Sequence, residues 1–309
     1  LAGKKFDFPL LYMGCYRQPV AGRDYFCKVN GGSSVYNLHK NITKDDYFLN
    51  IEKIRNFIEI GDVYQITYCI KALFDFKGSS YSLYRRLFRE QPVPYPAYIH
   101  TDNFDILSLS PEMFIYKKGG FITTKPMKGT WPKKNNLFMD MLSAMRLKYD
   151  SKNRAENVMI ADLLRNDLGR VGKLIRTPKL FEVASYRTLC QMTSTITAHI
   201  NHDIAVYDLF KAAFPSGSVT GAPRIRAMQI IKDIEKEERK IYTGAIGYIS
   251  PDKDMFFNIP IRTLLLSGGR GEMGIGGGIV WDSTPEGEWL EGEWKARFLS
   301  VLAVKYADR

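Results

Sequence analysis

The strand-like and helix-like segments of this chain come in blocks, and no segment between them has the composition of a linker. A helical pattern over 45–60, which Gly61 should stop, is followed by a strand pattern over 63–76, a turn-rich stretch at 92–96 and short strand patterns between 97 and 124. Because the pattern is not a strict alternation of strand and helix, it favours an α+β fold. Without a repeat or a Pro/Gly/Ser-rich tract, we expect one domain over 1–309.

The loop that carries Lys128 is expected to end the sheet formed by the strands at 97–99, 106–109, 113–116 and 121–124. The later elements follow the same block pattern. They are expected as a helix over 137–168 with a break near 151–153 and Gly169 as its C-cap, strands at 180–185 and 192–200, helices at 206–213 and from Pro223 to about 234, strands at 245–250, 255–266 and 272–275, and a helix over 285–304.

Cysteine spacing and hydropathy limit the class of protein. The four cysteines, Cys15, Cys27, Cys69 and Cys190, show no CxxC spacing, which argues against a zinc site or a disulfide scaffold and favours a reducing compartment. The start has no apolar signal region, and no run approaches the roughly 20 apolar residues of a membrane span. We therefore expect a cytoplasmic protein with no membrane association.

The formal charge of +11 is consistent with nucleic-acid binding, with a field that steers an anionic ligand, or simply with a lysine-rich proteome. The basic residues are spread out, and no helix-turn-helix or RNP-like pattern is present, so nucleic acid is not expected as a ligand. A noncatalytic basic scaffold that binds nucleic acid remains a rival from a different class, which salt-dependent DNA affinity would reveal. A small anionic substrate fits the charge equally well.

Lys128 lies in the stretch TKPMKGT at 124–130, between a proline and a glycine. A lysine amine is protonated near its reference pKa of about 10.4, so it becomes a nucleophile at neutral pH only when burial or a nearby cation lowers that value. Lys125 is a candidate for that cation. Taken alone, two lysines in a turn are more often solvated surface.

Two further patterns carry charge or backbone chemistry. Glu288 and Glu291 share one face of the last predicted helix, with Lys295 four residues after Glu291, and Glu156 begins an apolar helical run. Such carboxylates suit Mg²⁺, although a solvated salt-bridge face is the commoner meaning of the spacing.

The glycine run at 274–278 lacks both the GxGxxG frame and a Lys-Ser/Thr pair, so nucleotide binding is disfavoured. Its glycines would let a ligand carboxylate approach backbone N–H groups, with Arg262 as a bidentate partner, unless they only form a tight turn.

Together these segments resemble the chorismate-utilising enzymes, and within them the branch of aminodeoxychorismate synthase component I. The resemblance covers roughly 45–305. The matching segments are GDVYQ at 61–65, SPEMF at 110–114, PMKGT at 126–130, AENVMIADLLRNDLGRV at 155–171, GSVTGAP at 217–223, YTGAIGY at 242–248, IRT at 261–263, GGGIV at 276–280, and Glu288, Glu291, Lys295 and Ala296.

The resemblance implies a fold of two similar halves that form a packed antiparallel β-sandwich flanked by helices. It implies that Lys128 attacks C2 of chorismate as the C4 hydroxyl leaves, with Glu112 as general acid, and that ammonia then enters at C4 to give 4-amino-4-deoxychorismate for para-aminobenzoate and folate synthesis. It assigns Mg²⁺ to Glu156, Glu288 and Glu291. It assigns substrate contacts to Gly129, Thr130, Gln191, Tyr248, Arg262, Gly276, Gly278 and Lys295.

The resemblance also implies a glutaminase subunit that supplies ammonia, and it raises the question of a fused or downstream lyase. Anthranilate synthase is the alternative within the family; its members carry a small residue where this chain has Lys128. Water-using relatives carry a lysine after the glutamine that matches Gln65, whereas this chain has Ile66. Gln191 stands where many relatives have histidine, and most of the N-terminal segment of longer relatives is absent, so no bound tryptophan is expected.

Overall fold

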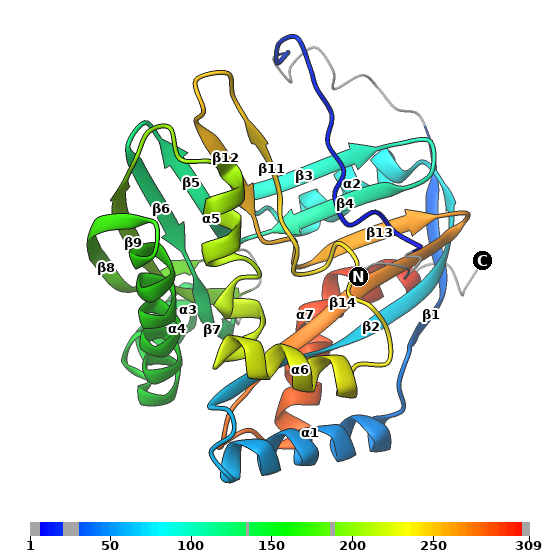
Figure 1. Ribbon diagram of the computed structural model, residues 1–309. Coiled ribbons are helices and arrows are strands. Elements are labelled where there is room, and N and C mark those ends of the chain that lie inside the picture. The colour runs from blue at the N-terminus through cyan, green and yellow to red at the C-terminus, as the bar shows by residue number, and fades with distance from the viewer. Residues whose placement is uncertain (1–6, 21–30, 134–135, 186–188, 305–309) are drawn as a thin grey trace.

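The computed structural model describes residues 7–20, 31–133, 136–185 and 189–304. Within them the strands form two seven-stranded sheets whose described pairings are all antiparallel, which confirms the α+β class (Figure 1). The elements are β1 Ser33–Lys40, α1 Lys44–Glu59, β2 Gln65–Gly78, α2 Ser80–Glu90, β3 Tyr95–His100, β4 Asp105–Ser110, β5 Met113–Lys118, β6 Phe121–Lys125, β7 Met127–Pro132, α3 Leu137–Tyr149, α4 Ser151–Gly169, β8 Gly172–Ser185, β9 Leu189–Ile200, α5 Val206–Ala213, the 3-10 turn η2 Gly217–Val219, β10 Gly221–Ala222, α6 Arg224–Ile234, β11 Ile246–Ile249, β12 Met255–Asn258, β13 Thr263–Ser267, β14 Arg270–Ile279 and α7 Pro285–Val304.

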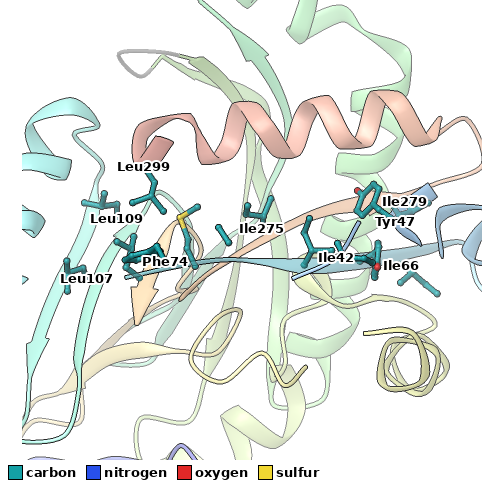
Figure 2. Packing of buried hydrophobic residues seen from close by; sticks show 14 of the residues in the cluster. Ile42, Tyr47, Ile66, Phe74, Leu107, Leu109, Ile275, Ile279 and Leu299 are labelled. Atoms are coloured by element: carbon teal, nitrogen blue, oxygen red, sulfur yellow. The ribbon is translucent and has the colours of Figure 1, made fainter. Parts of the chain in front are cut away.

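The first sheet has the order β1-β2-β14-β13-β4-β3, with β10 added to β2. Its centre is the long pair of β2 and β14, which stays in register from Asp75↔Arg270 to Ile66↔Ile279. Alternate residues of these strands point to a buried face, where Phe74 and Ile275 pack with Leu299 of α7 (Figure 2). Burial of this apolar face fixes α7 across the sheet, and α7 carries three of the predicted site residues.

The second sheet has the order β11-β12-β5-β6-β9-β7, with β8 paired to β9. Both β6 and β7 pair with β9, and Pro126 separates them. In β7, Met127 pairs with Thr193 and Thr130 with Gln191, so three steps along one strand match two along the other. This extra residue is a β-bulge at Lys128 and Gly129, which bends the strand and re-aims the lysine.

Among the described strands the chain passes from one sheet to the other four times, and two of these crossovers are short and lie next to each other. The first is at Pro111, between β4 of the first sheet and β5 of the second. The second is at Pro260, between β12 and β13. Proline cannot donate to a strand ladder, so each proline ends the pairing on one sheet. The Ser110 hydroxyl donates a 2.5 Å hydrogen bond to the Ile259 carbonyl, which ties the two crossovers together.

The crossovers correct three predictions. The strands between 97 and 124 do not form one sheet, because β3 and β4 belong to the first sheet and β5 and β6 to the second. The strand predicted over 255–266 is interrupted at 259–262 for the same reason. Lys128 is not in a loop that ends a sheet, since it lies inside β7. β1 and α2 were not predicted.

The helices agree closely with the sequence pattern. The break in the 137–168 helix falls at Asp150, whose side chain accepts a hydrogen bond from the Asn153 N–H and so starts α4. Gly61 has a φ of +75°, as a helix stop requires, and lies two residues after the last residue of α1. Gly169 was predicted as a cap but is the last residue of α4, and Arg170 is the cap. Pro223 is an N-cap and not a first-turn residue of α6.

The sequence predicts neither a disulfide scaffold nor a membrane-spanning segment. Cys15, Cys69 and Cys190 are free thiols, while Cys27 lies outside the described residues. Across the described ranges, no helix combines the length and apolar character that crossing a membrane requires.

Replacing Gly129 by alanine should destabilise the protein more than replacing Gly119. Both glycines have positive φ, +90° and +54°, which costs alanine about 1 kcal/mol. A Cβ on Gly129 would also lie 2.8 Å from the Asn153 Oδ1, whereas a Cβ on Gly119 meets nothing within 4 Å. Urea unfolding of the two variants should give the larger loss for Gly129→Ala, and equal losses would contradict a bulge packed against α4.

Candidate active site

A cleft of about 240 Å³ lies where the two sheets meet, next to the crossovers. Its walls come from both sheets, from the start of α4, from η2 and from α7. A larger groove of about 660 Å³ lies between α1 and α6, but none of the predicted site residues lines it. The cleft residues used below are Thr67, Glu112, Lys128, Gly129, Glu156, Gln191, Ser218, Val219, Tyr242, Arg262, Gly276, Gly278, Glu288, Glu291 and Lys295.

Lys128 projects from the β7 bulge into this cleft. A Cβ placed on Gly278 would lie 2.7 Å from its Nζ, so the amine rests against the glycine strand. Burial lowers the pKa of this amine, against the opposite effect of Glu156, and the Lys295 cation lowers it further. Solvated surface is therefore the wrong interpretation of this lysine.

The cation beside Lys128 is not the one that the sequence suggested. Lys125 lies on β6 and pairs with Glu182 of β8 at 3.7 Å. Lys295, from the last helix, supplies the positive charge instead. Its Nζ donates to the Gly276 carbonyl at 2.7 Å and pairs with Glu291 at 2.6 Å, so its position is fixed.

Glu112 lies at the first crossover and is 2% exposed. Burial raises the pKa of its carboxyl to about 7, although the Ser218 hydroxyl, which donates to Oε1 at 2.7 Å, and the Lys128 amine both oppose the shift. The glutamate is not an exposed turn residue. It is a buried carboxyl that carries a proton over part of the neutral range, as a general acid must.

The three predicted glutamates all line the cleft from two helices. Glu156 lies on α4, and burial raises the pKa of its carboxyl. Glu288 and Glu291 lie on α7. Burial and the neighbouring Glu291 raise the pKa of Glu288 to about 7, whereas Lys295 lowers the pKa of Glu291. The α7 pair therefore forms part of the cleft wall and not a solvated face.

The fit of this carboxylate set to a metal ion is partial. Over the described ranges, no three acidic, histidine or cysteine side chains converge closely enough to form a ready-made metal site. The donor chemistry still suits Mg²⁺, which binds through few carboxylates and fills its remaining positions with waters and substrate oxygens. Burial raises the pKa of both Glu156 and Glu288, and a divalent cation would offset that cost by stabilising their ionised forms.

The glycine run is part of a strand, not a turn. Gly274 to Gly278 lie in β14 and pair with β2 on one side, while β13 pairs only as far as Met273. On the side away from β2, no described strand pairs with β14 beyond Met273. Gly276 and Gly278 line the cleft here, so backbone groups are available to a ligand, as the glycine spacing suggested.

The remaining predicted contacts divide into three groups. Arg262 is buried at the second crossover with a φ of +51°, and Gln191 is 1% exposed on β9; both line the cleft. The Oε1 of Gln191 has no hydrogen-bond partner among the described residues. Thr130 is placed by its backbone alone, opposite Gln191. Tyr248 is not brought to the cleft, because β11 is the edge strand and leaves this tyrosine 63% exposed beside Phe256.

Ser218 lines the cleft and contacts Glu112, although the sequence pattern assigned it no role. It lies in the motif GSVTGAP, and its hydroxyl contacts Glu112 across 106 positions of sequence. Tyr242 and Thr67 also line the cleft without having been singled out. A serine in a glycine-rich turn can indicate a site residue. Its contact with Glu112 could not be predicted, because that contact depends on where the fold places the first crossover.

The chain is similar in sequence to known proteins. The family model described as chorismate binding enzyme matches residues 16–301. Aminodeoxychorismate synthase component 1 of Klebsiella aerogenes is 39% identical over 253 residues, which is 81% of this chain and 56% of that protein. Anthranilate synthase component 1 of Aquifex aeolicus is 36% identical over 88% of this chain and 55% of that protein. The chain thus spans a little over half the length of these relatives.

A solved structure shares the fold. The crystal structure of anthranilate synthase component I from Streptococcus pneumoniae aligns with a TM-score of 0.78 and 32% identity. The alignment covers 85% of this chain and 59% of that one. The two-sheet arrangement of this chain is therefore the fold of a chorismate-utilising enzyme.

Glu112→Gln should remove part of the pH dependence of stability. The folded pKa of about 7 lies above the unfolded value near 4.5, so the contribution of Glu112 is full below about pH 4.5 and is lost as the pH rises through 7. The free energy of unfolding of the variant, measured relative to that of wild type, should be on the order of 2 kcal/mol higher at pH 8 than at pH 4.5. Urea unfolding at both pH values measures this, with the exposed Glu286→Gln as control. Parallel pH profiles for wild type and Glu112→Gln would contradict the raised pKa.

Proposed function

This chain belongs to the chorismate binding enzyme family, and we propose that it converts chorismate and ammonia to 4-amino-4-deoxychorismate. The observation that carries the proposal is a lysine of lowered pKa inside the cleft, next to a buried glutamate of raised pKa. Names of several relatives, aminodeoxychorismate synthase component 1 among them, support the same reaction. We further propose that residues 1–309 act as one catalytic domain.

The Lys128 amine is the proposed nucleophile. In its neutral form it attacks C2 of the chorismate ring, both conjugated double bonds of the ring shift, and the hydroxyl at C4 leaves with a proton from the general acid. Burial and the Lys295 cation favour the neutral amine, as this step requires. Ammonia then attacks C4, both double bonds return to their original positions, and the lysine amine leaves from C2. The net change is one ammonia in and one water out.

Glu112 is the proposed general acid for the hydroxyl that leaves. A carboxyl with a pKa of about 7 holds its proton well enough to be present at neutral pH and releases it readily. The Ser218 hydroxyl holds one oxygen of this carboxyl at 2.7 Å, which leaves the other for the substrate. A neutral acid and a neutral amine in one cleft are the protonation states that this substitution needs.

The substrate is proposed to bind through its two carboxylates. Arg262 and the unpaired edge of β14 at Gly276 and Gly278 offer donors to the enolpyruvyl carboxylate. Gln191 and Lys295 line the part of the cleft that faces the ring, with Gly129 and Thr130 at the β7 bulge beside it. The amide of Gln191 cannot carry charge, so it serves as a hydrogen-bonding group and not as a base. Tyr248 is omitted from this set.

Mg²⁺ is the proposed cofactor, held by Glu156 and Glu291 with Glu288 close by. When bound, the ion would neutralise the ring carboxylate and the surrounding glutamates. The neighbouring side chains do the rest of the positioning, since Lys295 holds Glu291 and Ser283 donates to Glu288 at 2.6 Å.

A glutaminase subunit is the proposed source of ammonia, because the relatives are named as a first component. A lyase, separate or fused, would release 4-aminobenzoate from the product. Anthranilate synthase is the alternative function, and it is favoured by the Aquifex aeolicus and Streptococcus pneumoniae proteins. The two functions differ in the ring carbon that is aminated, so product analysis separates them.

Lys128→Ala should abolish the formation of 4-amino-4-deoxychorismate. Wild-type protein is incubated with chorismate, ammonium and Mg²⁺, and a lyase converts the product to 4-aminobenzoate for detection. Intact-protein mass spectrometry should show a ring adduct on wild type and none on the variant. The exposed Lys148→Ala serves as control. Anthranilate as the only product of wild type would overturn the proposal in favour of the alternative.

Removal of Mg²⁺ should stop the reaction, and the ion should restore it. EDTA removes the cation that neutralises the negative charge of the buried carboxylates. The rate should therefore fall to background and recover when Mg²⁺ is added. Glu156→Gln should raise the Mg²⁺ concentration for half-maximal rate by about tenfold or more. Glu286→Gln, on the exposed side of α7, should leave it unchanged. A rate that is insensitive to EDTA would sink the metal assignment.

A further inference from the structure

We propose that Arg239 is a positioning residue for the general acid: its guanidinium fixes the η2 turn against β2 and so holds the Ser218 hydroxyl on Glu112. Arg239 lies behind the cleft, in the segment after α6, and does not line it. The proposal rests on the proposed function, in which Glu112 protonates the leaving hydroxyl.

The guanidinium of Arg239 makes hydrogen bonds to η2, to β2 and to two side chains close to it in sequence, Glu235 and Thr243. Its Nη1 donates to the Val219 carbonyl of η2 at 2.7 Å, and its Nη2 donates to the Thr67 carbonyl of β2 at 2.7 Å. Its Nε and Nη2 also donate to the two carboxylate oxygens of Glu235 at 2.8 and 2.6 Å. The planar fork of arginine can serve all of these acceptors at once, whereas a lysine ammonium is a single point.

Glu235 extends this clamp to β2 by a second route. Its Oε1 accepts the backbone N–H of Cys69 at 2.9 Å, two residues from the carbonyl that Arg239 holds. Arg239 and Glu235 therefore form hydrogen bonds with two residues of β2, Thr67 and Cys69, and with one residue of η2, Val219. Both side chains are largely buried, with 16% and 6% of their surface exposed, so the grip is shielded from water.

The clamp lies one residue from the group that it is proposed to position. Val219 follows Ser218, whose hydroxyl contacts Glu112 at 2.7 Å and the Ser216 hydroxyl at 3.0 Å. The Thr67 N–H also donates to the Thr220 carbonyl at 2.6 Å, which places η2 directly beside β2. If the turn moves away from β2, the serine hydroxyl moves with it and leaves the carboxyl.

Few groups other than Ser218 act on the Glu112 carboxyl. From β7 the Lys128 amine faces it and the Met127 backbone donates to it; from η2 the Ser218 hydroxyl donates to it. Lys128 is the charged group of this set. A change at Arg239 leaves both β7 contacts in place, so its effect on Glu112 should travel through Ser218.

The test compares Arg239→Lys with Ser218→Ala. Loss of the Ser218 hydrogen bond removes a contact that favours the ionised carboxyl, so the Glu112 pKa should rise in both variants. The basic limb of the kcat profile, where the acid loses its proton, should move to higher pH in both. We expect kcat to fall about tenfold or more, with the KM for chorismate changed by less than about threefold. The double variant should shift the limb no further than Ser218→Ala alone.

A matched control separates positioning from simple loss of stability. Lys71 is also buried on β2 and pairs with Glu272 at 2.9 Å, but it does not line the cleft. Lys71→Gln should lower the urea midpoint without moving the pH limb. If Arg239→Lys behaves in the same way, or if its shift adds to that of Ser218→Ala, the proposal is wrong. Should Arg239→Lys not fold, Glu235→Gln weakens the same fork and should move the limb in the same direction.

A measurement without substrate distinguishes failure of this proposal from failure of the proposed function. The Glu112 carboxyl can be titrated by NMR in protein that carries ¹³C-labelled glutamate, with Glu112→Gln for assignment. Arg239→Lys and Ser218→Ala should both raise its midpoint. If the midpoint is raised in both variants but wild-type protein does not turn over chorismate, the role of Arg239 is supported and the proposed function is contradicted. Normal turnover with an unchanged midpoint would do the reverse.

Discussion

The hydrogen bond from Ser110 to the carbonyl of Ile259 joins two short crossovers, at Pro111 and at Pro260, where consecutive strands pass from one sheet to the other. Two sheets packed without such a tie could slide or open. With it, the residues that follow each proline are held at the junction; they include Glu112, directly after Pro111, and Arg262, two residues after Pro260. The cleft is therefore a consequence of chain path first and of side-chain chemistry second.

The charges inside the cleft are sorted by local contacts. Lys295 has a carboxylate and a carbonyl within hydrogen-bond distance and keeps Glu291 ionised. Lys128 and Glu112 lack comparable compensation, and desolvation dominates the pKa of each. The same residue types therefore shift in opposite directions at the two places: the Lys295 charge lowers the pKa of Glu291 on α7, whereas burial raises the pKa of Glu112 and lowers that of Lys128. The balance between burial and a paired charge, not residue type, sets the direction of each shift.

Local signals in the sequence predicted the helices well, because caps such as Asp150 and stops such as Gly61 act within a few residues. Motif order predicted most of the cleft residues, Lys128 and the three glutamates among them. Partners far apart in sequence were not predictable. Lys125 was chosen as the neighbouring cation because it is close in sequence, whereas Lys295 is close in space. The division of strands between sheets and the outward position of Tyr248 likewise depend on pairings that no local pattern encodes.

The glycine stretch of β14 restricts how this protein could change its selectivity. A methyl group at Gly276 would crowd the Cys69 thiol, one at Gly277 the Glu288 carboxylate, and one at Gly278 both Gln65 and the Lys128 amine. A substitution at Gly277 or Gly278 would therefore displace side chains to which a role in the cleft is assigned. Redesign of the cleft for a different ring or nucleophile would have to begin at lining side chains with no proposed role, such as Lys152 of α4 and Val219 of η2.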